Sequence, residues 1–278
     1  MRHGMPQIAT LEIDGRRFNV DLCAAHDLAI ALDFDGLQPR WFGGPLAHSA
    51  ALVSDGFSGR VSAGASCNCN TLSITPHCDG THTEGAGHLT KERLDVRTVV
   101  PSGLLPALLL SVLPARACAT GESTRPAPQA SDLLITRSAL AQAWPAALAF
   151  TPRALVVRTL PNCAAKRARD YRTQPAAFLS IAAAGLLVER GIEHLVLDVP
   201  SADRADDDGR LSAHREFFGL PPGSTALSAV RRPHCTITEL AYITDAAPDG
   251  VYLLSLQIPA LGGDAVPSRP LLFPAHAA

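Results

Sequence analysis

Six side chains able to bind a metal ion lie within twelve residues of this chain. They are His77, Cys78, Asp79, His82, Glu84 and His88, separated only by glycine, alanine and threonine. Imidazole, carboxylate and thiolate groups are ligands of zinc, manganese and iron. His82 and Glu84 are two residues apart, so an extended backbone points both to the same side, and Gly80 permits a sharp turn beside them. The spacing therefore predicts a metal site.

Two other interpretations stay open on these residues alone. Single histidines are most often surface or hydrogen-bonded core residues, and the chain has ten. Alternatively, Cys67 and Cys69, with Cys78 and a neighbouring histidine, could close a tetrahedral structural zinc site. The Cys67–Cys69 spacing is one residue short of the usual two-residue gap of such sites. A catalytic site would differ by leaving one metal position open for water.

The segment also resembles the signature of the cyclase family of metal-dependent hydrolases, to which bacterial kynurenine formamidase and isatin hydrolase belong. That signature reads His-x-Gly-Thr-His-x-Asp-x-Pro-x-His, and the stretch from Gly80 through His82 and Glu84 to His88 matches it in register. Glu84 replaces the family's Asp, and Ala86 replaces its Pro. Two residues separate His77 from Gly80 where the family has one.

The first position of the signature therefore falls to either His77 or Cys78. The preceding Thr75 and Pro76 match the family's lead-in and favour His77. By the resemblance, His77, His82 and Glu84 bind one metal ion. His88 would then be the proton shuttle, although its residue type also suits a partner that orients Glu84.

Further segments resemble the family in the order in which they occur. They are residues 20–22, 154–162, 197–203, 237–240, 256–259 and 267–270. In family members with two metals, a His that follows the segment matching 197–203 and a Glu within the segment matching 237–240 complete a second metal site. The resemblance thus implies that His214 and Glu239 are metal ligands here, with one or two divalent ions, zinc or manganese, per chain.

The resemblance implies a fold and an activity as well. The fold is an α/β domain of the β-rich, layered β/β/α (swivelling) type. The activity is hydrolysis of an amide in a small molecule, of the arylformamide or cyclic lactam type, through a metal-activated water. Two alternatives stay open: a metal-dependent cyclase or dehydratase of a secondary metabolite, and a non-catalytic member with a structural metal. Trp41 and Phe42 would either wall an apolar substrate pocket or pack in the core.

The whole chain sets further limits. With 278 residues we expect one domain spanning 1–278. A net charge of −2 gives no reason to expect a nucleic-acid partner. The longest apolar run, 104–113, is too short for a membrane span. An odd number of unevenly spaced cysteines, seven in all, and the absence of a visible signal favour the reducing cytoplasm. We also expect a homodimer.

Periodicity predicts a chain rich in strands with few helices. Strands are expected at 8–13, 18–22, 94–100, 133–136, 154–160, 195–199 and 250–258. Helices are expected at 137–143 and at 175–190, the latter capped by Thr173 and stopped by Gly191. Residues 115–131 are expected to form an exposed loop, and the acidic run 206–208 a solvated loop tip. Four cysteines are expected to be buried small apolar residues, namely Cys23, Cys118, Cys163 and Cys235.

Overall fold

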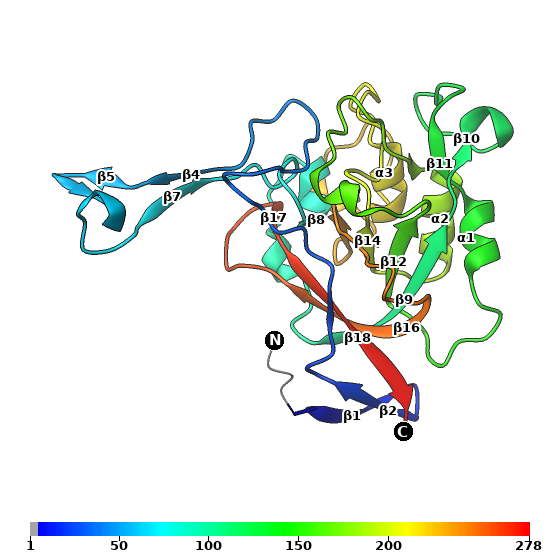
Figure 1. Cartoon of the computed structure of the whole chain (residues 1–278). Helices are drawn as coiled ribbons and strands as arrows, with labels where there is room; N and C mark the ends of the chain where they lie inside the picture. The colour runs from blue at the N-terminus through cyan, green and yellow to red at the C-terminus, as the bar shows by residue number, and fades with distance from the viewer. Residues whose placement is uncertain (1–4) are drawn as a thin grey trace.

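A single large mixed β-sheet organises the molecule, as the computed structural model of residues 5–278 shows (Figure 1). In spatial order its strands are β1 (Ile8–Ile13), β2 (Arg16–Asp21), β18 (Arg269–Ala277), β16 (Gly250–Gln257), β9 (Leu104–Val112), β12 (Ala154–Thr159), β14 (His194–Leu197), β15 (Thr236–Glu239), β8 (His82–Gly85) and β17 (Ala265–Pro267), with β3 (His26–Asp27) paired to β18. The predicted mixed, sheet-dominated class with few helices is confirmed.

The centre of the sheet is parallel and buried on both faces. β9, β12, β14 and β15 run parallel, whereas β8 and β17 join antiparallel at one end. All six residues of β12 are buried, as expected for a strand covered on both sides. The apolar run at 104–113 is accounted for by β9. No helix of the described residues is long and apolar enough to cross a membrane.

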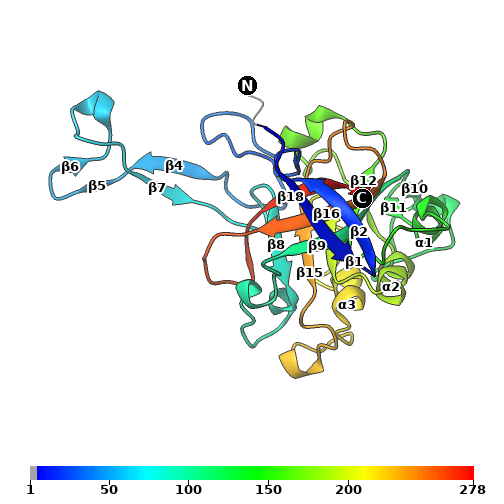
Figure 2. The same cartoon turned by 90° about the horizontal axis from the view of Figure 1, so that it is seen from below.

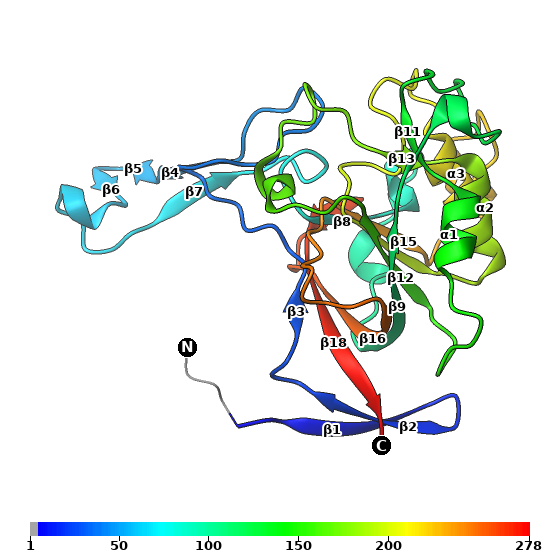
Figure 3. The ribbon, with the colours of Figure 1, turned by 45° about the vertical axis from the view of Figure 1, so that its right-hand side comes forward.

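Three helices cover one face of this centre (Figure 3). They are α1 (Arg137–Ala143), α2 (Ile181–Glu189) and α3 (Ser212–Phe218). Alternate strand residues such as Leu108, Leu155 and Leu195 pack against them. The intervening residues, such as Leu109 and Val156, pack on the opposite face. This alternation follows from the two-residue period of a strand.

The helix predicted at 175–190 begins later than expected. Its N-cap is Ser180, whose hydroxyl accepts a hydrogen bond from the Ala183 amide at 2.9 Å, and not Thr173. The apolar residues just before the cap form β13 (Phe178–Leu179), which pairs with β11 (Leu133–Ile135). β11 also pairs with β10 (Ala115–Arg116). Gly191 adopts φ 73° and ends the helix as predicted.

Several other expectations were wrong. Residues 94–100 form no strand but the 3-10 turn η3 (Val96–Thr98), whose N-cap Asp95 accepts a hydrogen bond from the Arg97 amide at 3.0 Å. In the acidic run, Asp206 and Asp208 are exposed as expected of a loop tip, whereas Asp207 is buried and accepts hydrogen bonds from the Gly209 and Leu211 amides. Cys23 and Cys118 are exposed, and Cys163 is half-buried; of the four cysteines expected to be buried, only Cys235 is.

The segment 115–131 is mostly irregular, but it contains more structure than an open loop. β10 opens it, and η4 (Ala117–Ala119) follows. Thr124 within it is buried, and its hydroxyl donates to the Pro126 carbonyl at 2.8 Å. Other short 3-10 turns of the described residues are η2 (Ala86–Leu89), η5 (Ala164–Ala168) and η6 (Leu227–Ala229).

A long hairpin arm projects from the body of the molecule and was not predicted (Figures 1 and 2). β4 (His48–Ala51) pairs with β7 (Asn70–Ser73), and beyond them β5 (Val53–Ser54) pairs with β6 (Phe57–Ser58), followed by η1 (Val61–Ala63). None of the residues of β4 and β7 is buried: β7 is exposed throughout, and β4 is half-buried at three of its four residues.

Candidate metal centre

β8 brings two of the predicted ligands onto one face of the sheet edge. All four of its residues are buried between β15 and β17. His82 and Glu84 share a face because they are two residues apart. Glu239 of β15 lies directly opposite His82 in the antiparallel register. Side chains directly opposite on antiparallel strands project on the same side, so this pairing adds a second carboxylate to the group.

The turn before β8 fixes the orientation of the His82 ring. Gly80 adopts φ 98°, and a Cβ there would lie 2.9 Å from a methyl group of Leu32. The Thr81 hydroxyl donates to the Leu240 carbonyl and accepts from the Ile30 amide, which ties the turn to the neighbouring loops. His82 Nδ1 lies 3.0 Å from the Gly80 carbonyl. That contact places the proton on Nδ1 and leaves Nε2 free to bind a metal.

The predicted ligands converge on Glu84. Its Oε2 lies 3.0 Å from His77 Nδ1, and its Oε1 lies 2.8 Å from His214 Nε2. Glu239 Oε2 is 3.5 Å from His82 Nε2, and Glu239 Oε1 is 3.4 Å from His214 Nε2. The five residues form two groups with ligand atoms within 4.8 Å of one another: His77, His82 and Glu84, and Glu84, His214 and Glu239. Glu84 belongs to both.

Four buried atoms of this cluster have no hydrogen-bond partner. They are His82 Nε2, both carboxylate oxygens of Glu84, and His214 Nε2. The nitrogen–oxygen distances are short, yet the angles are not those of hydrogen bonds. Buried polar atoms are nearly always hydrogen-bonded, and a specific exception calls for an explanation such as an ion. The donor set of three imidazoles and two carboxylates suits zinc or manganese. A divalent ion therefore fits these residues.

Burial and mutual charge act strongly on the cluster. Burial alone would raise the pKa of Glu84, but the positive charges of His88 and His214 hold it well below its usual range. Burial would lower the pKa of His214, but the Glu84 charge and the Asp203 hydrogen bond raise it well above normal. Burial would lower the pKa of His77, but the hydrogen bond to Asp264 and the negative charge of Glu84 raise it to about 10. A metal ion must displace these protons, so its affinity will depend on pH.

His88, the predicted proton shuttle, lies beside the cluster without entering either group around Glu84. Its Nε2 is 3.9 Å from Glu84 Oε2, and its ring centroid is 4.2 Å from that of His77. The side chain is partly exposed, in contrast to the buried Glu84. His88 thus lies at the solvent side of the candidate centre.

The cysteine alternatives do not assemble. No metal-ligating group of three among the described residues includes a cysteine. Cys67 is exposed and Cys69 half-buried, both on the segment of the projecting arm. The Cys78 sulfur instead faces Gly44, where an added Cβ would lie 3.0 Å from it. Of the two residues competing for the first position, His77 and not Cys78 faces Glu84.

Two acidic residues near the cluster carried no predicted role. Asp203 Oδ2 lies 2.7 Å from His214 Nδ1 and also accepts from the His214 amide at 3.0 Å, so it fixes the ring that faces Glu84. Asp264 Oδ2 lies 3.0 Å from His77 Nε2. Asp203 belongs to a segment that resembles the family, which was the available signal. Asp264 is an isolated acidic residue after Gly262 and Gly263, and the sequence contains no signal for it.

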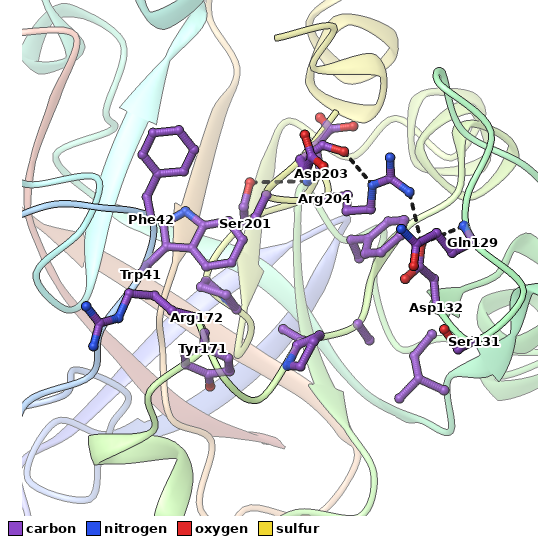
Figure 4. A pocket seen from close by; sticks show the side chains of 18 of the residues that line it. Trp41, Phe42, Gln129, Ser131, Asp132, Tyr171, Arg172, Ser201, Asp203 and Arg204 are labelled. Carbon is purple, nitrogen blue, oxygen red and sulfur yellow. Dashed lines mark hydrogen bonds and ion pairs between the residues drawn. The ribbon is translucent and has the colours of Figure 1, made fainter. Parts of the chain in front are cut away.

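A cavity of about 700 Å³ has Asp203, the hydrogen-bond partner of His214, among the residues that line it (Figure 4). Its walls include Trp41, Phe42, Tyr171 and Phe178, and Ser201 and Arg204 line it near Asp203. Trp41 is partly buried in this wall and Phe42 is 63% exposed, so neither packs in the core. An apolar cavity with a few polar groups beside a reactive cluster is the usual form of a small-molecule site.

Comparison with known proteins agrees with this geometry. The sequence model of a family described as "Putative cyclase" matches residues 26–204. The chain belongs to the cyclase family. The matched range holds His77, His82, Glu84 and His88, whereas His214, Glu239 and Asp264 lie beyond it. No curated protein matches the sequence.

Solved structures share the fold at low sequence identity. One is a predicted metal-dependent hydrolase from Bacillus stearothermophilus, with 17% identity and a TM-score of 0.55 over 90% of this chain and 97% of that one. An isatin hydrolase bound to the product analogue thioisatinate has 15% identity and a TM-score of 0.57, over 90% and 92%. Isatin hydrolase A from Ralstonia solanacearum has 17% identity and a TM-score of 0.55, over 90% of this chain and 91% of that one.

Proposed function

We propose that this cyclase-family chain is a metal-dependent hydrolase that cleaves an amide bond of a small molecule, of the arylformamide or cyclic lactam type. The observation that carries the proposal is the convergence of buried, unpaired imidazole and carboxylate atoms on Glu84. The shared fold with structures described as a metal-dependent hydrolase and as isatin hydrolase supports the reaction class. The short distances among these side chains in this chain support their assignment as ligands.

In this proposal the residues divide the ligand roles around one shared carboxylate. His77, His82 and Glu84 hold one divalent ion, zinc or manganese, and Glu84, His214 and Glu239 hold a second. When bound, such ions supply Lewis acidity, which lowers the pKa of a water molecule toward neutrality and polarises a carbonyl group. The Ala202 amide donates to Glu239 Oε1 at 2.6 Å and holds that carboxylate in place.

His88 supplies the proton transfer in this proposal. Hydrolysis of an amide requires a proton to leave the attacking water and another to reach the leaving amine. An imidazole can do both near neutral pH. His88 Nε2 faces Glu84, and its partly exposed ring borders the open side of the cluster. Trp41 and Tyr171 would hold the apolar part of the substrate in the adjoining cavity.

Metal content and a substrate panel together test the proposal. Protein purified without chelator should hold one to two equivalents of zinc or manganese by elemental analysis. N-formyl aryl amines and isatin-like lactams should be hydrolysed, and addition of a chelator should stop turnover. Conversion of a polyketide-like substrate without hydrolysis of either amide class would favour the cyclase alternative. Protein with no transition metal would contradict both.

A matched variant separates chemistry from metal binding. His88→Ala should retain its metal, while turnover falls by about 10²–10⁴, the usual share of general acid–base catalysis. His48→Ala, an exposed histidine of the projecting arm, is the control and should leave turnover unchanged. Loss of metal from His88→Ala would instead make His88 a ligand.

A further inference from the structure

Asp264 faces two imidazoles of the candidate centre at the same time. Its Oδ2 lies 3.0 Å from His77 Nε2 and 3.5 Å from His88 Nδ1. The two rings lie beside each other, with centroids 4.2 Å apart and planes at 32°. One carboxylate oxygen is therefore placed against the outer nitrogens of a candidate ligand and of the candidate proton shuttle.

The backbone around Asp264 is held independently of its side chain. Its carbonyl accepts a hydrogen bond from the Gly85 amide at 3.0 Å, and the Gly263 carbonyl accepts from the Val96 amide at 2.9 Å. Gly87 lies under this loop, where an added Cβ would come within 2.6 Å of the Leu94 carbonyl and 3.3 Å of Asp264 Cβ. The chain thus brings Asp264 close to the η2 turn that carries His88, and only a residue without a side chain fits between them.

The placement determines which nitrogen of each ring faces the cluster. His77 Nδ1 lies 3.0 Å from Glu84, so the opposite nitrogen, Nε2, is the one that donates to Asp264. His88 is arranged with Nδ1 toward Asp264 and Nε2 toward Glu84. A carboxylate on the outer nitrogen of an imidazole fixes the tautomer and the ring orientation, both for metal ligands and for general bases.

We propose that Asp264 is a positioning residue that orients His77 for metal binding and His88 for proton transfer. The inference rests on the proposed function, since it assigns roles through these two histidines. Asp264 also forms a group of three with His77 and His88 that could hold an ion directly. Its 44% exposed side chain and its contact with the outer nitrogens place it on the rim of the cluster, which favours the positioning role.

The first experiment measures metal binding to the purified protein, using zinc in competition with a chelator and the visible absorption of the cobalt-loaded protein. Asp264→Ala should weaken metal affinity by about 10–100-fold and change the cobalt spectrum, since His77 is no longer held in one orientation. Asp264→Asn, whose amide oxygen can still accept from His77, should lose less. Asp35→Ala removes the same charge from an exposed loop and should bind metal as the wild type does.

The second experiment tests the role through His88 by a double-mutant cycle at saturating metal. Asp264→Ala should lower kcat by about 10–100-fold with little change in KM. In the His88→Ala background the same substitution should have no further effect on kcat. If the two losses multiply, Asp264 does not act through His88 and the inference is wrong.

Three results separate this inference from the proposed function. If the wild type binds metal and Asp264→Ala binds it with unchanged affinity and spectrum, only the role of Asp264 is contradicted. If Asp264→Ala holds fewer metal equivalents at saturation, Asp264 is a ligand and the positioning role is contradicted. A wild-type protein that binds no divalent ion contradicts the proposed function itself.

Discussion

Two groups of buried charged side chains lie close to neighbouring strands of the sheet; one group has all of its hydrogen bonds satisfied and the other does not. At the ends of β12 and β14, the ammonium of Lys166, a residue of η5, donates to Asp198 and to both oxygens of Thr159, at 2.6 to 2.9 Å. Asp198 also accepts from the amide and hydroxyl of Thr159. On β8 and β15, by contrast, Glu84 has two oxygens without a hydrogen bond.

This difference helps to distinguish buried charged residues that stabilise the fold from those that bind a ligand. Lys166 and Asp198 are 3% and 1% exposed, and every donor of the ammonium has an acceptor, so the pair needs nothing further. Glu84 is fully buried and still leaves atoms open toward a common point. A buried polar group without a partner costs about 1–3 kcal/mol, and a charged one costs more. A fold keeps such groups where a ligand satisfies them.

The largest effect is expected from Glu84→Gln, which removes the shared charge of both candidate ion sites. Metal content should fall by at least one equivalent, and turnover by about 10³-fold or more, since Lewis-acid stabilisation is worth several kcal/mol. The unfolding free energy of the metal-free variant should change by only about 1 kcal/mol, because few good hydrogen bonds are lost. Elemental analysis, kinetics and denaturant unfolding in chelator measure the three quantities. Unchanged metal content would contradict the role of Glu84 as a ligand, and with it the difference from the Lys166–Asp198 pair.

Lys166→Met tests the other side of the comparison. It leaves Asp198 buried without its partner, so unfolding in denaturant should show a loss of about 3–5 kcal/mol, while metal content stays at the wild-type value. The double variant with Asp198→Leu should recover most of the loss. Arg137→Met breaks an exposed pair with Glu189 and should cost no more than about 1 kcal/mol. A small loss in Lys166→Met would mean that the satisfied pair contributes little.

The part of the site that the sequence could predict is the part within one short window. His77, His82, Glu84 and His88 are visible because their spacing along the chain is itself the pattern. His214 and Glu239 required the resemblance to the family. Asp264 reaches the cluster only through the register of β17 on β8, in which Ala265 lies opposite Glu84. No local pattern encodes such a pairing.

For the fold, too, the sequence predicted elements that have a local pattern and missed those that lack one. Strands with a strong apolar pattern were predicted, such as β12 and β16. The start of α2 was misplaced because Phe178 and Leu179 continue its apolar stripe, although they belong to a strand, and periodicity cannot separate short apolar runs. The projecting arm was missed because its strands, for example 70–73, are polar and exposed on both faces, so they lack the alternation of a half-buried strand.

Asp203 shares features with both groups of buried charged residues, and its substitution is expected to have a smaller effect on metal binding. It is fully hydrogen-bonded, yet it supports His214, whose Nε2 is unpaired. Asp203→Asn should weaken metal affinity by about 10–100-fold, because both oxygens of Asp203 accept hydrogen bonds and an amide keeps only one oxygen to do so. Chelator competition measures the affinity. Asp206→Asn, an exposed acid three residues away, is the control. Equal affinities of the two variants would show that His214 needs no such support.

The smallest effect concerns His194, a buried imidazole satisfied by a neutral hydroxyl, with Nδ1 2.9 Å from Thr236 Oγ1. Burial lowers its pKa to about 4, and the nearby Arg153 adds to this, while Glu193 opposes it. The unfolded chain, with a pKa near 6.5, binds a proton more readily than the folded protein does. Stability should therefore be full above pH 6.5 and fall as pH drops toward 4, at about 1 kcal/mol per pH unit.

His194→Gln should remove this part of the pH dependence, whereas His48→Gln, at an exposed position on the arm, should keep it. Denaturant unfolding in chelator between pH 5 and pH 7 measures the slope. The raised pKa values of His77 and His214 act in the opposite direction and are common to all three proteins, so the difference between variants isolates His194. Parallel slopes for wild type and His194→Gln would mean that this imidazole is protonated at little cost, and that a hydroxyl partner does not keep it neutral in the sheet.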